Sequence, residues 1–388
     1  MARILLMTDS SEAFSRRLLR GISQYAHAEH EAWSLSRIPI SLKEKIGLRG
    51  IAAHAKSINT DAIIGQFDKR EDIEIFTKKG IIVIAQDYGI RFEGIPNISA
   101  NHHDGGAIVA TYFIRHGFDS FAFFGPGDTV FSEERKAGFE EAIRKERPDA
   151  PISSLMTRKT ALWGCDMEEL CEWLESLPKP VAIMACDDNW AYYITEACDR
   201  LKVSNAEGNF NIPEDIAVVG VNNDDTICGL SNPNLSSLDQ DIEKCGYRVA
   251  MMINEMLHNP EEVVHDILIS PSGIVTRQSS DIFVNDDANI TAVLKYIHEN
   301  IGQKLSVDDI VAQVPLSRRL LEKKFRSQMN TSIAEYVRKV RVDSMASLLE
   351  KGKTVSEAAF DLGYSDIKNI SRIFKHIKGV SPSDYCKK

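Results

Sequence analysis

Residues 356–382 read SEAAFDLGYSDIKNISRIFKHIKGVSP, and this stretch decides the fold of the C-terminal part of the chain. Its apolar residues recur every three or four positions, the spacing of helices that bury one face. Gly363 divides the pattern where the chain must turn tightly, since glycine adopts a left-handed backbone at the lowest cost. Pro382 stands at the first position of a last short helix. The stretch therefore predicts a helix-turn-helix unit over about 356–376.

A similar pattern precedes it, at about 307–326. Ser306 can cap a short helix, and Pro315 ends that helix because proline lacks a backbone N–H and its ring clashes with the preceding turn. Ser317 then opens a second helix. We therefore expect an all-helical domain over 290–388 with two helix-turn-helix units, joined to the rest of the chain by a linker at 281–289.

The charge of this domain differs from that of the remaining chain. Residues 285–388 contain 18 Lys and Arg against 13 Asp and Glu, whereas the rest contains 28 against 43. A basic module gains affinity for DNA by releasing counterions from the phosphates. A helix that reads base edges needs one face in its own core and one free face. Any single charge could equally lie on an ordinary solvated helix surface, but the whole set favours DNA. The candidate DNA-contacting residues are Arg318, Arg319, Glu322, Lys323, Lys368, Ser371 and Arg372.

Residues 1–280 contain short apolar runs that alternate with helical patterns. Runs at 62–65, 121–125 and 216–221 are continuously apolar, which is typical of strands in a parallel sheet covered by helices on both faces. The length favours two α/β lobes over one. The expected lobes are about 1–116 with 236–262, and about 117–235 with 263–280.

Polar residues follow these expected strands. In open parallel sheets, ligands bind beyond the carboxyl ends of the strands. Short acids and amides can pair with the hydroxyls of a sugar, and aromatic rings can stack on its C–H faces. At any single position, capping of the next helix is the alternative interpretation. Together they predict a monosaccharide cleft between the lobes. The candidate ligand-binding residues are Ser10, Phe14, Gln66, Asp68, Asp87, Asn101, Phe131, Arg135, Asp187 and Asn222.

Enzyme chemistry is poorly supported. Gly-Pro-Gly at 125–127 suggests a phosphate loop, but Val130 stands where its third glycine would be. Asp187 and Asp188 are adjacent, so their side chains should point apart. The adjacent histidines of 102–104 converge poorly on one metal ion. We therefore expect no catalytic residues, no metal site, no cofactor and no enzyme activity.

Residues 358–365, 372–375 and 379–382 resemble the DNA-binding domain of the AraC/XylS family of activators. Two residues depart from that pattern. Ile370 stands where the family often has an aromatic residue, and Ile367 stands where a polar, base-contacting residue is common. The resemblance implies two recognition helices that enter the major groove.

Residues 115–125 and 212–220 resemble the LacI/GalR effector domain, which is similar to periplasmic sugar-binding proteins. The stretch Arg-Lys-Ala-Gly-Phe at 135–139 matches the Arg-x-x-Gly-aromatic motif of that family, whose arginine holds a ligand hydroxyl. Asp187 stands where the family has a ligand-binding Asn or Asp, and Asn222 stands where Asp is common. The chain starts at an expected strand, so the usual N-terminal DNA reader of this family is not expected.

The pairing of the two domains resembles activators of xylose operons. It implies xylose or another pentose as effector, promoter DNA and RNA polymerase as partners, a homodimer, and control of sugar catabolism.

Seven scattered cysteines without a C-x-x-C pair fit a reducing cytoplasm. No apolar run is long enough for a signal peptide or a membrane span. The alternative is a sugar-binding or sugar-modifying protein whose C-terminal helices dock a protein partner.

Overall fold

The computed structural model divides the chain into two compact units. The first unit contains Met1–Tyr112 and Asp119–Asp281, and the second contains Phe113–Phe118 and Ile282–Lys388. The described residues are 2–8, 12–38, 40–67, 70–86, 90–127, 129–157, 165–205, 208–259, 265–282, 284, 287–303, 305–329, 331–350, 352–364 and 367–385.

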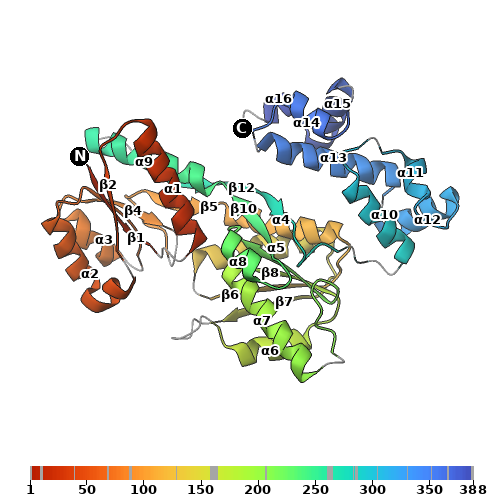
Figure 1. Ribbon diagram of the computed structural model, residues 1–388, viewed down its shortest axis with the longest axis horizontal. Helices are drawn as coiled ribbons and strands as arrows, with labels where there is room; N and C mark the ends of the chain where they lie inside the picture. The colour runs from red at the N-terminus through yellow and green to blue at the C-terminus, as the bar shows by residue number, and fades with distance from the viewer. Residues whose placement is uncertain are drawn as a thin grey trace. The chain divides into compact units, whose positions relative to one another are not determined.

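The first lobe of the first unit is a parallel sheet between two layers of helices (Figure 1). One face packs on α1 and α9 through residues such as Leu18 and Val249, and the other packs on α2 and α3 through residues such as Ile51 and Phe76. The strand order is β11-β5-β4-β3-β1-β2. The strands are β1 (Arg3–Met7), β2 (Ser34–Arg37), β3 (Ala62–Gln66), β4 (Ile82–Gln86), β5 (Asn97–Ala100) and β11 (Ile267–Ile269), and the helices are α1 (Ala13–Ala28), α2 (Ile40–Ser57), α3 (Arg70–Thr77) and α9 (Ile242–His258).

The second lobe has a sheet of order β12-β10-β9-β8-β6-β7. It is parallel except for β12, which runs antiparallel to β10, a departure from the all-parallel expectation. Helices α4 and α5 approach closely, because a Cβ on Gly138 would lie 1.9 Å from the carbonyl oxygen of His103. The strands are β6 (Phe121–Pro126), β7 (Ile152–Thr157), β8 (Val181–Ala185), β9 (Ile216–Val221), β10 (Ser236–Gln240) and β12 (Pro271–Val275), and the helices are α4 (His102–Arg115), α5 (Val130–Glu146), α6 (Met167–Ser176), α7 (Asp188–Ser204) and α8 (Asp225–Leu230).

The lobe boundaries differ from the expected ones. Strand β10, expected in the first lobe, pairs with β9 in the second sheet. Strand β11, expected in the second lobe, pairs with β5 in the first sheet. Among the described residues, the chain therefore passes between the sheets near 101, 241 and 270. Apolar patterning identifies a strand, but which sheet the strand joins depends on tertiary pairing.

The C-terminal part of the second unit is helical, as predicted. Three of its described helices start at capping boxes, one of them formed by Ser332 and Glu335 at the start of α13. Ser306 and Asp309 cap α11, and Thr354 and Glu357 cap α14. Helix α14 therefore begins at Val355, one residue before its expected start at Ser356. The reason is that its Thr-x-x-Glu capping signal begins at Thr354, two residues before Ser356. The helices are α10 (Ala288–Glu299), α11 (Val307–Val311), α12 (Arg318–Met329), α13 (Ile333–Glu350), α14 (Val355–Asp361), α15 (Ile367–Lys378) and α16 (Pro382–Tyr385).

Each helix-turn-helix unit has its own hydrophobic core. Leu321 and Phe325 of α12 pack in a cluster with residues of α10 and the first part of α13. Ile370 and Phe374 of α15 pack in a second cluster with α14 and the last part of α13. Gly363 has a φ of 70°, which confirms the left-handed turn expected there. Helix α13 thus contributes to both cores.

The segment Phe113–Phe118 belongs to the second unit although it continues from helix α4. The backbone N–H of Val284 donates to the carbonyl of His116 at 2.7 Å, and the Tyr336 hydroxyl donates to the carbonyl of Arg115 at 3.3 Å. Gly117 has a φ of 87°, and a Cβ there would lie 2.0 Å from the carbonyl oxygen of Val284. The end of α4 is therefore held among residues of the helical domain.

The His298 ring is part of this packing. It lies 5.7 Å from the His116 ring, centroid to centroid, and its Nε2 is 3.1 Å from the Tyr336 hydroxyl oxygen. Burial, with contributions from His116 and Arg115, lowers the pKa of His298 from 6.5 to about 3. The folded protein therefore keeps this ring neutral over a pH range in which the unfolded chain is protonated.

We expect the second unit to lose stability as the pH falls from about 6.5 towards 3, because only the unfolded state then binds the proton. At pH 5 the loss attributable to His298 should be up to about 2 kcal/mol. His298→Gln should reduce this pH dependence, measured by thermal unfolding of the full chain followed by circular dichroism. His376→Gln, at an exposed histidine of α15, is the control. Equal pH dependence in wild type and His298→Gln would contradict the assignment.

Candidate functional sites

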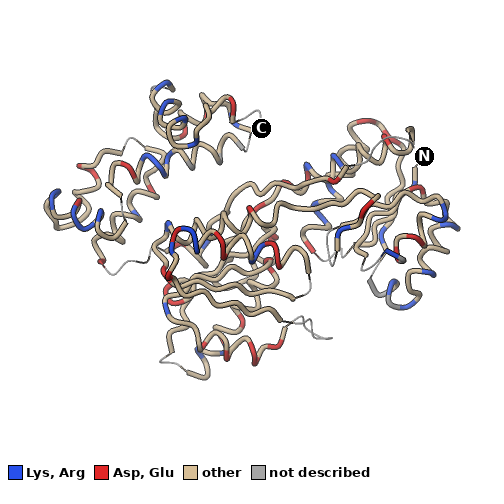
Figure 2. The backbone as a smooth tube through the Cα atoms, turned by 180° about the vertical axis from the view of Figure 1, so that it is seen from behind, with Lys and Arg blue, Asp and Glu red and all other residues tan. Residues whose placement is uncertain are grey.

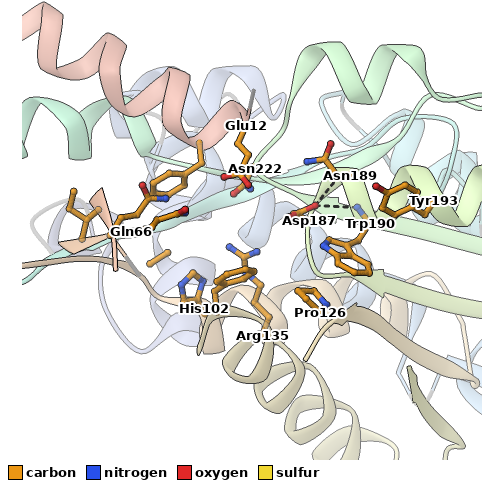
Figure 3. A pocket seen from close by; sticks show the side chains of 15 residues that line it. Glu12, Gln66, His102, Pro126, Arg135, Asp187, Asn189, Trp190, Tyr193 and Asn222 are labelled. Carbon is orange, nitrogen blue, oxygen red and sulfur yellow. Dashed lines mark hydrogen bonds between the residues drawn. The ribbon is translucent and has the colours of Figure 1, made fainter. Parts of the chain in front are cut away.

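A pocket lies between the two lobes of the first unit (Figure 3). Its walls come from the carboxyl ends of strands in both sheets and from the helices that follow them. It encloses about 940 Å³ of empty space, including its mouth. The lining side chains are Glu12, Phe14, Gln66, Gln86, Ile98, Ala100, His102, Pro126, Phe131, Arg135, Asp187, Asn189, Trp190, Tyr193 and Asn222.

Arg135 is a buried cation in the pocket wall, with 4% of its surface exposed. Its Nη1 donates to the carbonyl of Cys186 at 2.6 Å, and its guanidinium lies 5.5 Å from the centre of the Phe131 ring. Both contacts fix the orientation of the guanidinium. A rigid, planar donor of this kind suits an oxygen-rich ligand.

Asp187 both lines the pocket and caps helix α7. Its Oδ1 accepts from the backbone N–H groups of Asn189 at 2.9 Å and Trp190 at 3.1 Å (Figure 3). The sequence left open whether Asp187 caps a helix or contacts a ligand. Its position is compatible with both roles. The two bonds hold the carboxylate at the pocket edge.

Asp188 takes no part in the pocket lining. Its Oδ1 accepts from the Ser237 hydroxyl at 2.6 Å, and its Oδ2 accepts from the backbone N–H of Asp224 at 2.7 Å. Burial raises the pKa of Asp188 to about 8, although both hydrogen bonds act in the opposite direction. The two adjacent carboxylates point to different surroundings, as expected, and do not form an acid/base pair.

Asn222 is held in place from two sides. Its Oδ1 accepts from Gln240 Nε2 at 2.9 Å, and its carbonyl accepts from Arg17 Nη1 at 2.9 Å. Its φ is 96°, a backbone region that asparagine enters more readily than most residues. Arg17 lies on α1 of the first lobe and Asn222 follows β9 of the second, so this contact bridges the lobes at the pocket.

Among the described residues, three ion pairs also bridge the lobes, and the first joins Arg17 of α1 to Asp239 of β10 at 2.7 Å. Arg16 of α1 is 2.8 Å from Asp224, the capping residue of α8. Arg91, which follows β4, is 2.7 Å from Glu134 of α5. The Asp224 side chain is only 7% exposed. Arg16 of the opposite lobe therefore balances the charge of a largely buried carboxylate.

The second candidate site is the exposed surface of helices α12 and α15. On α12, Arg318, Arg319 and Lys323 are exposed and Glu322 is half-buried. On α15, Lys368 and Arg372 are exposed and Ser371 is half-buried. Lys and Arg recur along these helices (Figure 2). Arg318 Nη1 forms an ion pair with Asp308 of α11 at 2.8 Å.

Comparison with known proteins matches both parts of the chain. Residues 110–280 match the periplasmic binding protein-like domain, and residues 310–388 match a helix-turn-helix domain. The chain joins a periplasmic binding protein-like domain to a helix-turn-helix domain. This confirms the pairing that the two sequence resemblances predicted.

Two curated relatives and one solved structure align with almost the whole chain, and another solved structure aligns with part of it. The xylose operon regulatory proteins of Escherichia coli and Haemophilus influenzae are 24% and 25% identical to the chain, over 99% of it and 96% and 97% of their own lengths. The structure of the xylose-binding transcription activator xylR covers 99% of this chain and 97% of its own, with a TM-score of 0.56 and 21% identity. A LacI family regulator from Enterococcus faecium with bound ribose covers 72% of this chain and 98% of its own, with a TM-score of 0.58 and 19% identity.

Most of the ligand-binding residues predicted within the described part of the chain line the pocket. Phe14, Gln66, Phe131, Arg135, Asp187 and Asn222 do so, whereas Ser10, Asp68 and Asp87 lie outside the described residues. Asn101 is not in the lining. Its side chain instead bonds with the carboxylate and backbone N–H of Asp104, at the start of α4. For this residue the capping interpretation holds.

Six polar or aromatic lining residues were not among the candidates: Glu12, Gln86, His102, Asn189, Trp190 and Tyr193. Gln86 directly follows one expected strand, and Asn189 lies shortly after another. The sequence could therefore have placed both among the candidate ligand-binding residues. Tyr193 lies inside α7 and Glu12 just before α1, where sequence offers no comparable signal. Within the described part of the chain, no cluster of three His, Cys, Asp or Glu residues could hold a metal ion. Likewise, none of the described helices is long and apolar enough to cross a membrane.

Two substitutions at Asp187 should separate its two roles. Asparagine caps helices about as well as aspartate, whereas alanine cannot accept the α7 amides. We expect Asp187→Asn to preserve the stability of the first unit and Asp187→Ala to lower it by about 1 kcal/mol. Urea unfolding measures both variants. Equal stability of Asp187→Ala and wild type would show that the cap contributes nothing.

Proposed function

We propose that this protein is a DNA-binding transcription regulator whose effector is a neutral monosaccharide. The main support for this function is that one chain combines two features. It has a polar pocket between two lobes, and it has two helix-turn-helix units with basic exposed faces. The relatives of matching length are transcription regulators of xylose operons. Among sugars, xylose is therefore the first candidate, with other pentoses next.

The lining of the pocket supports a neutral, hydroxyl-rich ligand. Arg135 is accompanied by the carboxylates of Glu12 and Asp187, so the lining has no excess of positive charge for a phosphate or an acid. Phe14, Phe131 and Trp190 add rings that suit the C–H faces of a sugar. Within the described residues, the buried Oε1 of Gln86 has no hydrogen-bond partner. A ligand hydroxyl would satisfy it, which lowers the cost of its burial.

Sugar binding is tested by calorimetry with D-xylose, other pentoses and hexoses on the full chain. Arg135→Gln should weaken binding of the effector at least tenfold, about 1.4 kcal/mol, because a charge-assisted hydrogen bond is lost. Gln66→Ala, at a half-buried position, provides a second variant with little risk to folding. Lys145→Gln, at an exposed position of α5, is the control and should bind like wild type. Undiminished affinity in both pocket variants, with the fold intact, would overturn the site.

DNA binding is tested by gel shift against promoter fragments at several salt concentrations. The proposal requires salt-dependent binding, and Lys323→Ala and Arg372→Ala should weaken it without changing sugar affinity. The alternative, a sugar protein whose helices dock another protein, requires no DNA binding at any salt concentration. The outcome therefore separates the two functions directly.

We propose that the sugar stabilises a closed arrangement of the two lobes, in which the contacts across the cleft form. A ligand that binds between lobes favours the state in which both lobes reach it. The ion pairs Arg16–Asp224 and Arg91–Glu134 join the lobes and would add to the stability of that state. The apparent sugar affinity then depends on the fraction of the protein that is closed.

Arg16→Gln should therefore weaken sugar binding by about threefold, since partly exposed ion pairs contribute less than about 1 kcal/mol. Arg20→Gln is the matched control. Arg20 lies one turn further along α1, and its carboxylate neighbour, Glu243 at 3.7 Å, belongs to the same lobe. Calorimetry measures both variants. A loss of similar size in both, or in neither, would contradict the role of the bridge between lobes.

We further propose that helix α4 transmits closure to the DNA-binding units. His102, at its start, lines the pocket, and its last residues belong to the second compact unit. A dimer would carry four helix-turn-helix units for adjacent half-sites, and recruitment of RNA polymerase would make the regulator an activator.

A further inference from the structure

The two recognition helices have the same length and the same internal register. Helices α12 and α15 each have 12 residues, and in both of them the fourth and eighth residues are fully buried. These are Leu321 and Phe325 in α12, and Ile370 and Phe374 in α15. The buried pairs therefore align the helices position by position. Arg318 of α12 corresponds to Ile367 of α15.

Ile367 lies outside the core that its helix packs against. Its surface is 40% exposed, whereas Ile370, one turn later, is fully buried. Among the described residues, Ile367 is absent from the hydrophobic cluster that contains Ile370 and Phe374. It forms a ridge with Ser371, four residues later, beside the ridge of Lys368 and Arg372. An apolar side chain is thus placed on the surface that carries the basic residues.

The chemistry of the major groove suits this placement. The first residues of a recognition helix approach the base edges most closely. Most groups on those edges donate or accept hydrogen bonds. An isoleucine side chain can neither donate nor accept one. The exception is the C5 methyl group of thymine. Contact between isoleucine and that methyl removes apolar surface from water, which is favourable.

We propose that Ile367 reads a thymine through its C5 methyl group, so that the second helix-turn-helix unit selects a T·A pair where the first, with Arg318, favours a guanine. The two units of one chain then read different elements, and an operator must contain both in a fixed order. This inference rests on the proposed DNA-binding function and adds the base preference of the second unit.

The test compares thymine with deoxyuridine, which lacks only the methyl group. Preferred sites are first selected from random duplex DNA with the full chain, with and without D-xylose. Each thymine of the preferred site is then replaced by deoxyuridine in turn, and affinities are measured by fluorescence anisotropy. For wild type, we expect about a three- to fivefold loss at one position in the half of the site bound by α15, the scale of one buried methyl group.

Variants connect that loss to the side chain. Ile367→Ser and Ile367→Asn, which present no methyl group to the thymine, should bind thymine and deoxyuridine equally at that position. Ile377→Ala is the matched control, because Ile377 is also an isoleucine of α15 and is 38% exposed, but in the last turn. It should keep the sensitivity of wild type. Thermal unfolding checks that all variants remain folded.

The outcomes are distinguishable. Identical deoxyuridine profiles for wild type and both Ile367 variants would overturn the assignment while leaving DNA binding established. Sensitivity that disappears in Ile377→Ala as well as in the Ile367 variants would also overturn it. Failure to select any site, at low salt and with sugar, would instead contradict the proposed DNA-binding function, and this inference with it.

Discussion

Helix α4 links the two compact units, because this one continuous helix contributes residues to both. It starts at the pocket with His102, and its last residues, from Phe113 on, belong to the helical unit. The chain just beyond it is closely fitted, since Gly117 leaves no room for a Cβ against the carbonyl of Val284. A hydrogen-bonded helix changes its length little, so a shift at one end is carried to the other. In the proposed mechanism, this covalent link is the physical path from effector to DNA reader.

Hydrogen bonds within the protein hold several polar side chains of the pocket. Arg135 is held by the carbonyl of Cys186, Asp187 by the amides of α7, and Asn222 by Gln240. Side chains that are already fixed lose little freedom on binding, which favours affinity. The same bonds stabilise the fold, so the residues that would contact a ligand also cap a helix or join neighbouring segments.

The sequence predicted those features that depend on local periodicity or on a short motif. The spacing of Leu321 and Phe325, and of Ile370 and Phe374, identified both recognition helices, and their burial confirms it. Features that depend on tertiary pairing were not predictable in this way. The sheet membership of β10 and β11 was predicted wrongly, and Asn101 proved to bond with Asp104 instead of lining the pocket. Tyr193 reaches the pocket from within a helix, where only the fold brings it near.

We propose that sugar binding and DNA binding are coupled through one chain. Coupling of this kind is reciprocal, so the sugar must change DNA affinity by the same factor by which DNA changes sugar affinity. The direct measurement is a pair of titrations on the full chain: promoter DNA with and without saturating D-xylose, and D-xylose with and without saturating promoter DNA. We expect a change of at least about fivefold that is equal in both directions. Tight binding of both ligands with no change in either affinity would contradict it.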